Sequence, residues 1–133
     1  MVVMNEWNTY RSIVGIAHMN TKSHGKTIAN AISMYADDYD GLLPPHSSNA
    51  AWQSLLLPYG RPVFNSHNPK GGTFVPNDRV AGYQLSKLDN DTIIASEENP
   101  WRDGEQAYVF ADGSAKFLKA IDLKNLEPKP KAK

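Results

Sequence analysis

The stretch that decides the fold lies at residues 106–119 and reads QAYVFADGSAKFLK. Two runs rich in apolar and aromatic residues flank an Asp-Gly pair, a pattern typical of a β-hairpin. We predict strands over 106–111 and 114–119, joined by a two-residue type I′ turn at Asp112-Gly113, because small or Asx residues tolerate the positive φ angles of that turn.

The two-residue turn also predicts the register of the hairpin. In this register Phe110 lies opposite Ala115. Tyr108 then lies opposite Phe117, and because alternate residues of a strand share a face, all four side chains are expected to form one apolar face. We expect this face to cover the long helix predicted upstream.

An amphipathic helical pattern runs from about Trp7 to Tyr39. Apolar residues recur every three or four positions, which is typical of a helix with one buried face. The polar run 20–25 interrupts this pattern and ends in glycine, which costs about 1 kcal/mol in a helix interior, so we expect a break or kink there. The apolar positions of the second half are Ile28, Ala31, Ile32 and Tyr35.

Stop signals and short elements fill the middle of the chain. Gly41 suits a left-handed helix C-cap and Pro44-Pro45 cannot continue a helix, so the long helix is predicted to end here. Residues 50–57 predict two turns of helix. Residues 61–82 are rich in Pro, Gly and Asn and are predicted to be an irregular loop. Two further strand candidates are 83–85 and 91–96.

The composition limits the fold and the function. A chain of 133 residues fits one domain, and we expect it to cover residues 1–126, with 1–24 as a helical extension. The tail 127–133 has no apolar periodicity and is predicted to be flexible and basic. Lys and Arg number 14, as do Asp and Glu, which disfavours nucleic acid as a partner. Cysteine is absent, and the apolar runs are far shorter than the roughly 20 residues that span a bilayer.

Three segments carry a family likeness in the same order along the chain. The first is 34–44, MYADDYDGLLP, and the second is 52–59, which ends in Leu-Pro-Tyr. The third is the hairpin 108–118, YVFADGSAKFL. Over about residues 25–120 the chain resembles bacterial type II secretion pseudopilin-like proteins of the group named for a His, nine residues and Asp-Gly. The motif positions with a structural role are Tyr35, Asp38, Gly41, Arg102, Asp112 and Gly113.

The resemblance implies an α+β, pilin-like fold, in which a long N-terminal helix packs on a small antiparallel sheet closed by a C-terminal hairpin. It implies a non-catalytic structural or interaction subunit, with other pseudopilin or envelope proteins as partners, in the periplasm or outside a bacterial cell. The alternative is a soluble extracellular or periplasmic recognition module on the same fold, which would bind through the loop 61–82 and Trp101. A hydrolase of unusual architecture ranks third.

Three features depart from the family pattern. The processing site, a Gly before Phe-Thr-Leu-Ile-Glu and an apolar helix, is missing, so we expect either a truncated or altered sequence or a member that has lost membrane anchoring. The family's cysteines are missing too. Arg102 stands at the position of the motif His, nine intervening residues before Asp112, and we expect it to pin the loop to Asp112 by a charge-assisted hydrogen bond rather than to bind a ligand.

Two acidic stretches offer oxygen ligands for Ca²⁺. Neither has the alternating ligands and distal bidentate Glu of a proper calcium loop, so a helix cap and solvated acidic turns are the favoured interpretation. Calcium is known among major pseudopilins, so the resemblance keeps it as a minor alternative, and no other cofactor is expected. The candidate ligands are Asp37, Asp38 and Asp40 at the helix end, and Glu97, Glu98 and Asp103 before the hairpin.

Histidine and tryptophan are the other side chains to consider for binding. The four histidines have no metal-ligand spacing along the chain, so we predict them to be solvated or loop residues. Trp101 either lies exposed, where its indole can stack on a sugar or a partner, or covers the edge of the core.

Overall fold

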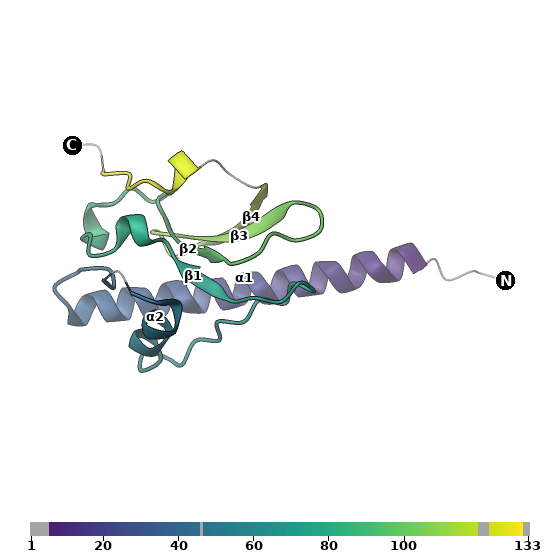
Figure 1. The fold of residues 1–133 in the computed structure, drawn as a ribbon, viewed down its shortest axis with the longest axis horizontal. Coiled ribbons are helices and arrows are strands. Elements are labelled where there is room, and N and C mark those ends of the chain that lie inside the picture. Colours follow the sequence, from purple (N-terminus) through teal and green to yellow (C-terminus); the bar gives the residue numbers. More distant parts are fainter. Residues whose placement is uncertain (1–5, 46, 120–122, 132–133) are drawn as a thin grey trace.

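The computed structural model describes residues 6–45, 47–119 and 123–131. One long helix lies against a four-stranded antiparallel sheet, which confirms the expected α+β class (Figure 1). The helices are α1 (Glu6–Asp38) and α2 (Asn49–Leu56), and the strands are β1 (Phe74–Pro76), β2 (Ile93–Glu97), β3 (Glu105–Phe110) and β4 (Ala115–Lys119). Short 3-10 turns lie at Asp78–Val80, Leu85–Lys87 and Leu123–Leu126.

The predicted break near residues 20–25 is wrong, because α1 is one continuous helix of 33 residues. Gly25 is buried where the helix crosses the sheet. A Cβ at this position would lie 2.9 Å from the Cβ of Ala115 and 3.3 Å from Cγ2 of Val109. The glycine therefore permits a close approach of helix and sheet, and the packing gained there outweighs its propensity cost of about 1 kcal/mol.

The C-terminal end of α1 follows the predicted stop signal. Gly41 has a φ of +80° and its N–H donates to the carbonyl of Ala36 over 2.7 Å. Asp40 also has a positive φ, +59°. The two left-handed residues turn the chain away from the helix, as glycine and Asx residues do at helix ends.

The hairpin lies where it was predicted, but its register is wrong by one residue. Val109 pairs with Ala115 and Ala107 with Phe117. The loop contains three residues, because the N–H of Phe110 donates to the carbonyl of Ser114 and the N–H of Gly113 donates back to the carbonyl of Phe110. This is a type I turn followed by a left-handed Gly113, whose φ is +89°.

The shift in register changes which side chains face α1. Because a one-residue slip moves a strand's side chains to the opposite face, Tyr108 and Phe110 lie away from the helix in a small cluster with Ile93 and Leu126. Val109 lies in the main core under α1. The expected single face of Tyr108, Phe110, Ala115 and Phe117 is therefore wrong.

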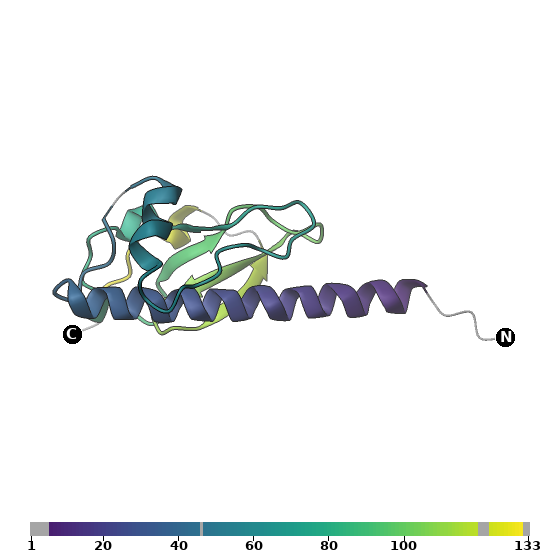
Figure 2. The same cartoon turned by 90° about the horizontal axis from the view of Figure 1, so that it is seen from below.

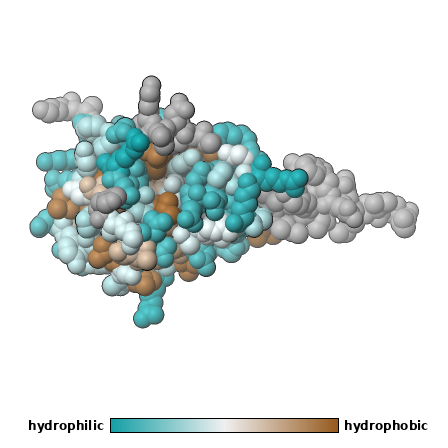
Figure 3. Space-filling model, viewed as in Figure 1, coloured by the Kyte–Doolittle hydropathy of each residue, from teal (hydrophilic) through white to brown (hydrophobic). Residues whose placement is uncertain are grey.

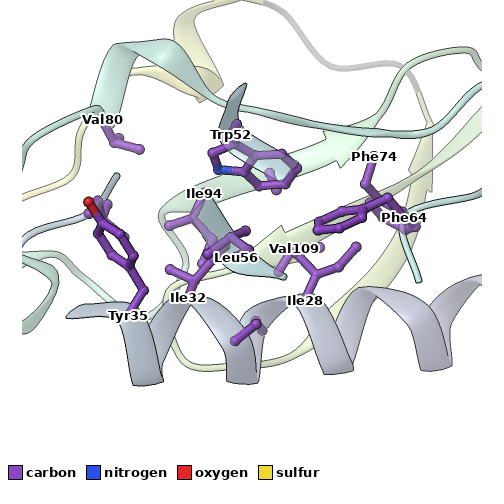
Figure 4. Packing of buried hydrophobic residues seen from close by; sticks show 14 of the residues in the cluster. Ile28, Ile32, Tyr35, Trp52, Leu56, Phe64, Phe74, Val80, Ile94 and Val109 are labelled. Atoms are coloured by element: carbon purple, nitrogen blue, oxygen red, sulfur yellow. The ribbon is translucent and has the colours of Figure 1, made fainter. Parts of the chain in front are cut away.

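The main core lies between α1 and the sheet, and α2 closes one side of it (Figure 4). The predicted stripe of Ile28, Ile32 and Tyr35 points into this core, and all three are at most 5% exposed. Trp52 and Leu56 of α2 are buried against the same cluster, as the predicted short helix required.

Two segments outside the hairpin differ from the sequence-based expectation. The expected irregular loop 61–82 contains β1, which pairs with β2 at the edge of the sheet. No strand forms over 83–85; among the residues described there, Gln84 makes an isolated bridge with Leu42 and a 3-10 turn begins at Leu85.

Residues 127–131 are docked, which differs from the expected flexible tail. Pro130 bridges to Leu88, and the N–H of Lys131 donates to the carbonyl of Lys87 over 2.9 Å. Glu127 forms an ion pair with Arg79. Pro128 and Pro130 hold this segment extended, and the carbonyl of Lys129 between them accepts from the N–H of Asp89 in the adjacent segment of the same chain.

The N-terminal part of α1 extends well beyond the sheet, as two perpendicular views agree (Figures 1 and 2). His18 contacts Phe117 of β4, whereas Gly15 and Ile16, one turn earlier, are exposed. The molecule thus consists of a compact head and a projecting helical segment.

Candidate functional site

The most organised polar group in the head is the carboxylate of Glu97, at the end of β2. Its side chain is 1% exposed. Trp101 Nε1 donates to its two oxygens over 2.8 and 2.9 Å, and the N–H of Ala107 donates over 2.8 Å. The hydroxyl of Ser66 donates to the same carboxylate. A buried carboxylate is costly unless its oxygens are hydrogen-bonded, and here structural donors occupy them.

The bond from Ser66 joins the loop after α2 to the sheet, and its neighbours join the same loop to α1. The N–H of His67 donates to Oγ1 of Thr21 over 3.1 Å, and Thr21 is fully buried. Asn68 donates through Nδ2 to the carbonyls of Asn99 and Pro100, each over 3.1 Å. Loop 61–73 is therefore fixed to both layers of the head.

Trp101 lies in the core and not on a recognition surface. It is 4% exposed, its N–H is bound by Glu97, and its ring makes edge contacts with His18 and Phe117. The His18 ring also stacks on Phe117, with centroids 4.1 Å apart. The second of the two sequence interpretations, a tryptophan that covers the core edge, describes the observed position.

The acidic residues at the end of α1 do not converge on one point. Asp37, Asp38 and Asp40 are all exposed. Asp38 accepts a hydrogen bond from the hydroxyl of Tyr59 over 2.8 Å. This bond, followed by desolvation and the nearby Asp38 charge, raises the pKa of Tyr59 to about 12.

Tyr59 and Tyr35 form an aromatic corner that joins the end of α1 to the segment after α2. Tyr35 stacks on Tyr39 with ring centroids 4.3 Å apart, and Tyr59 meets it edge-on at 5.9 Å. Burial, and then the charge on Tyr39, raises the pKa of Tyr35. The motif position Gly41 thus ends the helix, while Tyr35 and Asp38 contact Tyr59 and hold the segment after α2.

The acidic residues before the hairpin do not converge on one point either. Glu97 is buried, whereas Glu98 and Asp103 are exposed. Asp103 accepts from the N–H of Glu105 over 2.9 Å, which is a local turn bond. Among the described residues no group of three or more His, Asp or Glu side chains is placed to hold a metal ion.

Asp112 has a local partner in place of the expected one. Its Oδ1 accepts from the hydroxyl of Ser114 over 2.6 Å and from the N–H of Ser114 over 2.9 Å. These bonds lower the pKa of Asp112. Both Arg102 and Asp112 are described, and no hydrogen bond or ion pair joins them, so the predicted bridge does not hold the loop.

Exposed apolar side chains lie on α1 on either side of His18, where the helix leaves the sheet. Ile16 is 59% exposed and Met19 is 69% exposed. Residues three apart share one face of a helix, so the two side chains form one apolar strip on the side away from His18. On the face of the molecule drawn in Figure 3, apolar residues are scattered in small groups among polar ones.

Sequence reasoning missed the roles of Thr21, Gly25, Ser66 and Glu97. Gly25 carries a signal, because a glycine inside an amphipathic helix marks either a break or a close contact, and only packing distinguishes them. Glu97 ends the strand run Ile93-Ile94-Ala95-Ser96, and its place at the end of a largely apolar strand is a signal for a buried carboxylate. Thr21 and Ser66 depend on tertiary contacts across 46 and 31 residues.

No helix within the described ranges has both the length and the hydropathy to cross a bilayer. Comparison of the chain with protein-family models, curated proteins and solved structures finds no match.

Proposed function

We propose that this chain is a non-catalytic structural or interaction subunit, with a head resembling that of pseudopilins, in a type II secretion or pilus-like system of a bacterial cell envelope. The observation that carries the proposal is the division of α1. One helix has its C-terminal part in the core of the head, while its N-terminal part extends outside.

The geometry of α1 supports an assembly role. At 1.5 Å per residue a 33-residue helix is about 50 Å long, longer than a small head needs for its core. Isolated helical segments are marginally stable in water and gain most of their stability from packing. A second chain is therefore the expected partner of the projecting segment, and the exposed Ile16 and Met19 at the base of that segment give the partner an apolar strip.

The polar chemistry of the head supports the non-catalytic part of the proposal. The carboxylate of Glu97 is bound to Trp101, Ser66 and the backbone of Ala107, and Asp112 is bound to Ser114. These acidic groups fix loops in place. The resemblance of segments 34–44 and 108–118 to the pseudopilin-like group adds the envelope setting and the kind of partner.

The absence of cysteine allows a clean test by crosslinking. Single-cysteine variants Ile16→Cys and Met19→Cys would be produced in the source bacterium, with Leu57→Cys as a control that is 46% exposed on the head. We expect a thiol crosslinker to join the two α1 variants to a second copy of the chain or to a prepilin-type subunit, identified by mass spectrometry.

The proposal fails if the three positions crosslink alike, or if neither α1 position crosslinks while the control does. Ile16→Glu and Met19→Glu provide a second measurement. Both positions are exposed, so each variant should change the free energy of unfolding of the purified chain by no more than about 0.5 kcal/mol, as is usual for surface changes. Assembly should nevertheless be lost.

A further inference from the structure

Two histidines that are 43 positions apart in the sequence lie side by side in the fold. His24 is on α1 and His67 is in the loop after α2, and their ring centroids are 5.0 Å apart with the planes 37° from parallel. Two imidazoles that share one tetrahedral metal ion, with metal–nitrogen distances of about 2.0–2.1 Å, have ring centroids about 5 Å apart. The separation of the ring centroids thus permits both imidazoles to bind one ion.

The hydrogen bond of His24 fixes the tautomer that a ligand needs. Its Nδ1 lies 2.9 Å from the carbonyl oxygen of Asn65. A carbonyl only accepts, so Nδ1 carries the proton, and Nε2 of the neutral ring keeps its lone pair. A backbone carbonyl behind the ring is the usual partner of a metal-binding histidine, because it orients the imidazole and increases its basicity.

The backbone of His67 is held by its own contacts and those of its neighbour. Its N–H donates to Oγ1 of Thr21, one turn before His24 on the same helix. Ser66, the preceding residue, donates to the buried Glu97. The loop is therefore held beside the pair to α1 through Thr21 and to the sheet through Glu97, which reduces the entropy that ion binding would cost.

Both histidines remain accessible from solvent. His67 is exposed and His24 is partly exposed. An ion can therefore reach the pair, and water can complete its coordination, because the described residues place no third His, Asp or Glu with them. A site with two protein ligands and open positions binds more weakly than a closed four-ligand structural site.

We propose that His24 and His67 form a surface site for one divalent transition-metal ion that prefers imidazole, such as Zn²⁺, Ni²⁺ or Cu²⁺. Ca²⁺ and Mg²⁺ are excluded by this donor set, since they require oxygen ligands. The bound ion clips loop 61–73 to α1. This inference stands independently of the proposed function, because it uses the head alone.

The test is a titration of the full chain with ZnCl₂ after removal of metal by EDTA, followed by calorimetry and by thermal unfolding. We expect one ion per chain and a thermal midpoint raised by several degrees at saturation, because a ligand that binds only the folded state stabilises it. CaCl₂ should leave the midpoint unchanged.

His67→Ala is the principal variant, since an exposed loop side chain can be removed without loss of folding. His24→Ala is the second, and Lys70→Ala, which removes another exposed side chain of the same loop, is the control. We expect both principal variants to lose at least tenfold in zinc affinity while the control retains it. The proposal is overturned if the parent chain shows no saturable binding, if both principal variants bind like the parent, or if the control loses binding equally.

Discussion

At the scale of single residues, the head is organised around carboxylates that act as hydrogen-bond acceptors. Glu97 accepts hydrogen bonds from Trp101, from Ala107 of β3 and from Ser66 in the loop after α2. Asp38 accepts one from Tyr59, after α2, and Asp112 accepts from Ser114 in its own turn. A carboxylate has about four acceptor sites and no donor when ionised. One such residue can therefore satisfy several N–H and O–H groups that the fold removes from water.

Replacement of Glu97 by Ala is expected to destabilise the head by roughly 2–5 kcal/mol. The indole N–H of Trp101 and the N–H of Ala107 would lose their acceptor, and each unsatisfied buried donor costs about 1–3 kcal/mol. Urea unfolding monitored by tryptophan fluorescence measures the change. The matched control is Glu98→Ala, next in sequence but exposed, which should change stability by less than about 0.5 kcal/mol. Equal effects for the two variants would refute the role of Glu97.

Tyr59 gives the head a pH dependence in the alkaline range. Its pKa is raised from 10.0 to about 12 by the hydrogen bond to Asp38, so the protonated phenol is favoured in the folded state. This contribution to stability is therefore complete below pH 10 and is lost as the pH rises through about 12. In a titration of phenolate absorbance, we expect Tyr59→Phe to remove a late-ionising group and Asp38→Asn to return it to the ordinary range. A titration curve of unchanged shape in Asp38→Asn would contradict this assignment.

At the scale of elements, the contact between α1 and the hairpin sets the fold. Gly25 lets the helix touch Ala115 and Val109, so the strands that meet there carry small or branched side chains. The larger Tyr108 and Phe110 lie on the opposite face, with Leu126. The two faces of the hairpin therefore pack against different parts of the chain.

The two helices, β2 and the two hairpin strands could be predicted from the sequence, but β1 and the facing of the hairpin could not. An Asp-Gly pair fits both a two-residue loop and a three-residue loop with glycine last, and the flanking strands have apolar residues on both faces. Asp112 favours the longer loop by accepting from Ser114, a contact visible only in three dimensions. The break expected at Gly25 failed for a similar reason, because propensity does not include packing.

Gly25→Ala and Gly15→Ala are expected to have opposite effects. At Gly25 the new methyl group would press on Ala115, and overpacking of this kind costs about 1–3 kcal/mol. At Gly15 an added Cβ would meet none of the described atoms outside the surrounding helix backbone within 4 Å, so the gain in helix propensity should stabilise the chain by about 0.5–1 kcal/mol. Chemical unfolding followed by circular dichroism distinguishes them, and stabilisation by both variants would show that α1 does not contact the sheet at Gly25.

At the scale of the whole molecule, stability is divided along α1. Backbone amides between residues 26 and 37 lie in the part covered by the sheet and α2, whereas those between 10 and 16 lie in the projecting part. Local opening is cheapest where few buried contacts must be broken. In hydrogen exchange measured by mass spectrometry, the isolated chain should therefore exchange much faster over 10–16 than over 26–37. Equal protection of the two ranges in a monomer would contradict this division.

Because α1 is continuous, the projecting segment and the head move together as one rigid body. From His18, where contact with β4 begins, to Glu6, where the helix starts, the rise is about 18 Å. A rocking of the head by roughly 10° would then displace the far end by about 3 Å, half of one helical turn. A partner that holds the far end would therefore transmit force and tilt to the sheet, with no hinge between them to absorb either.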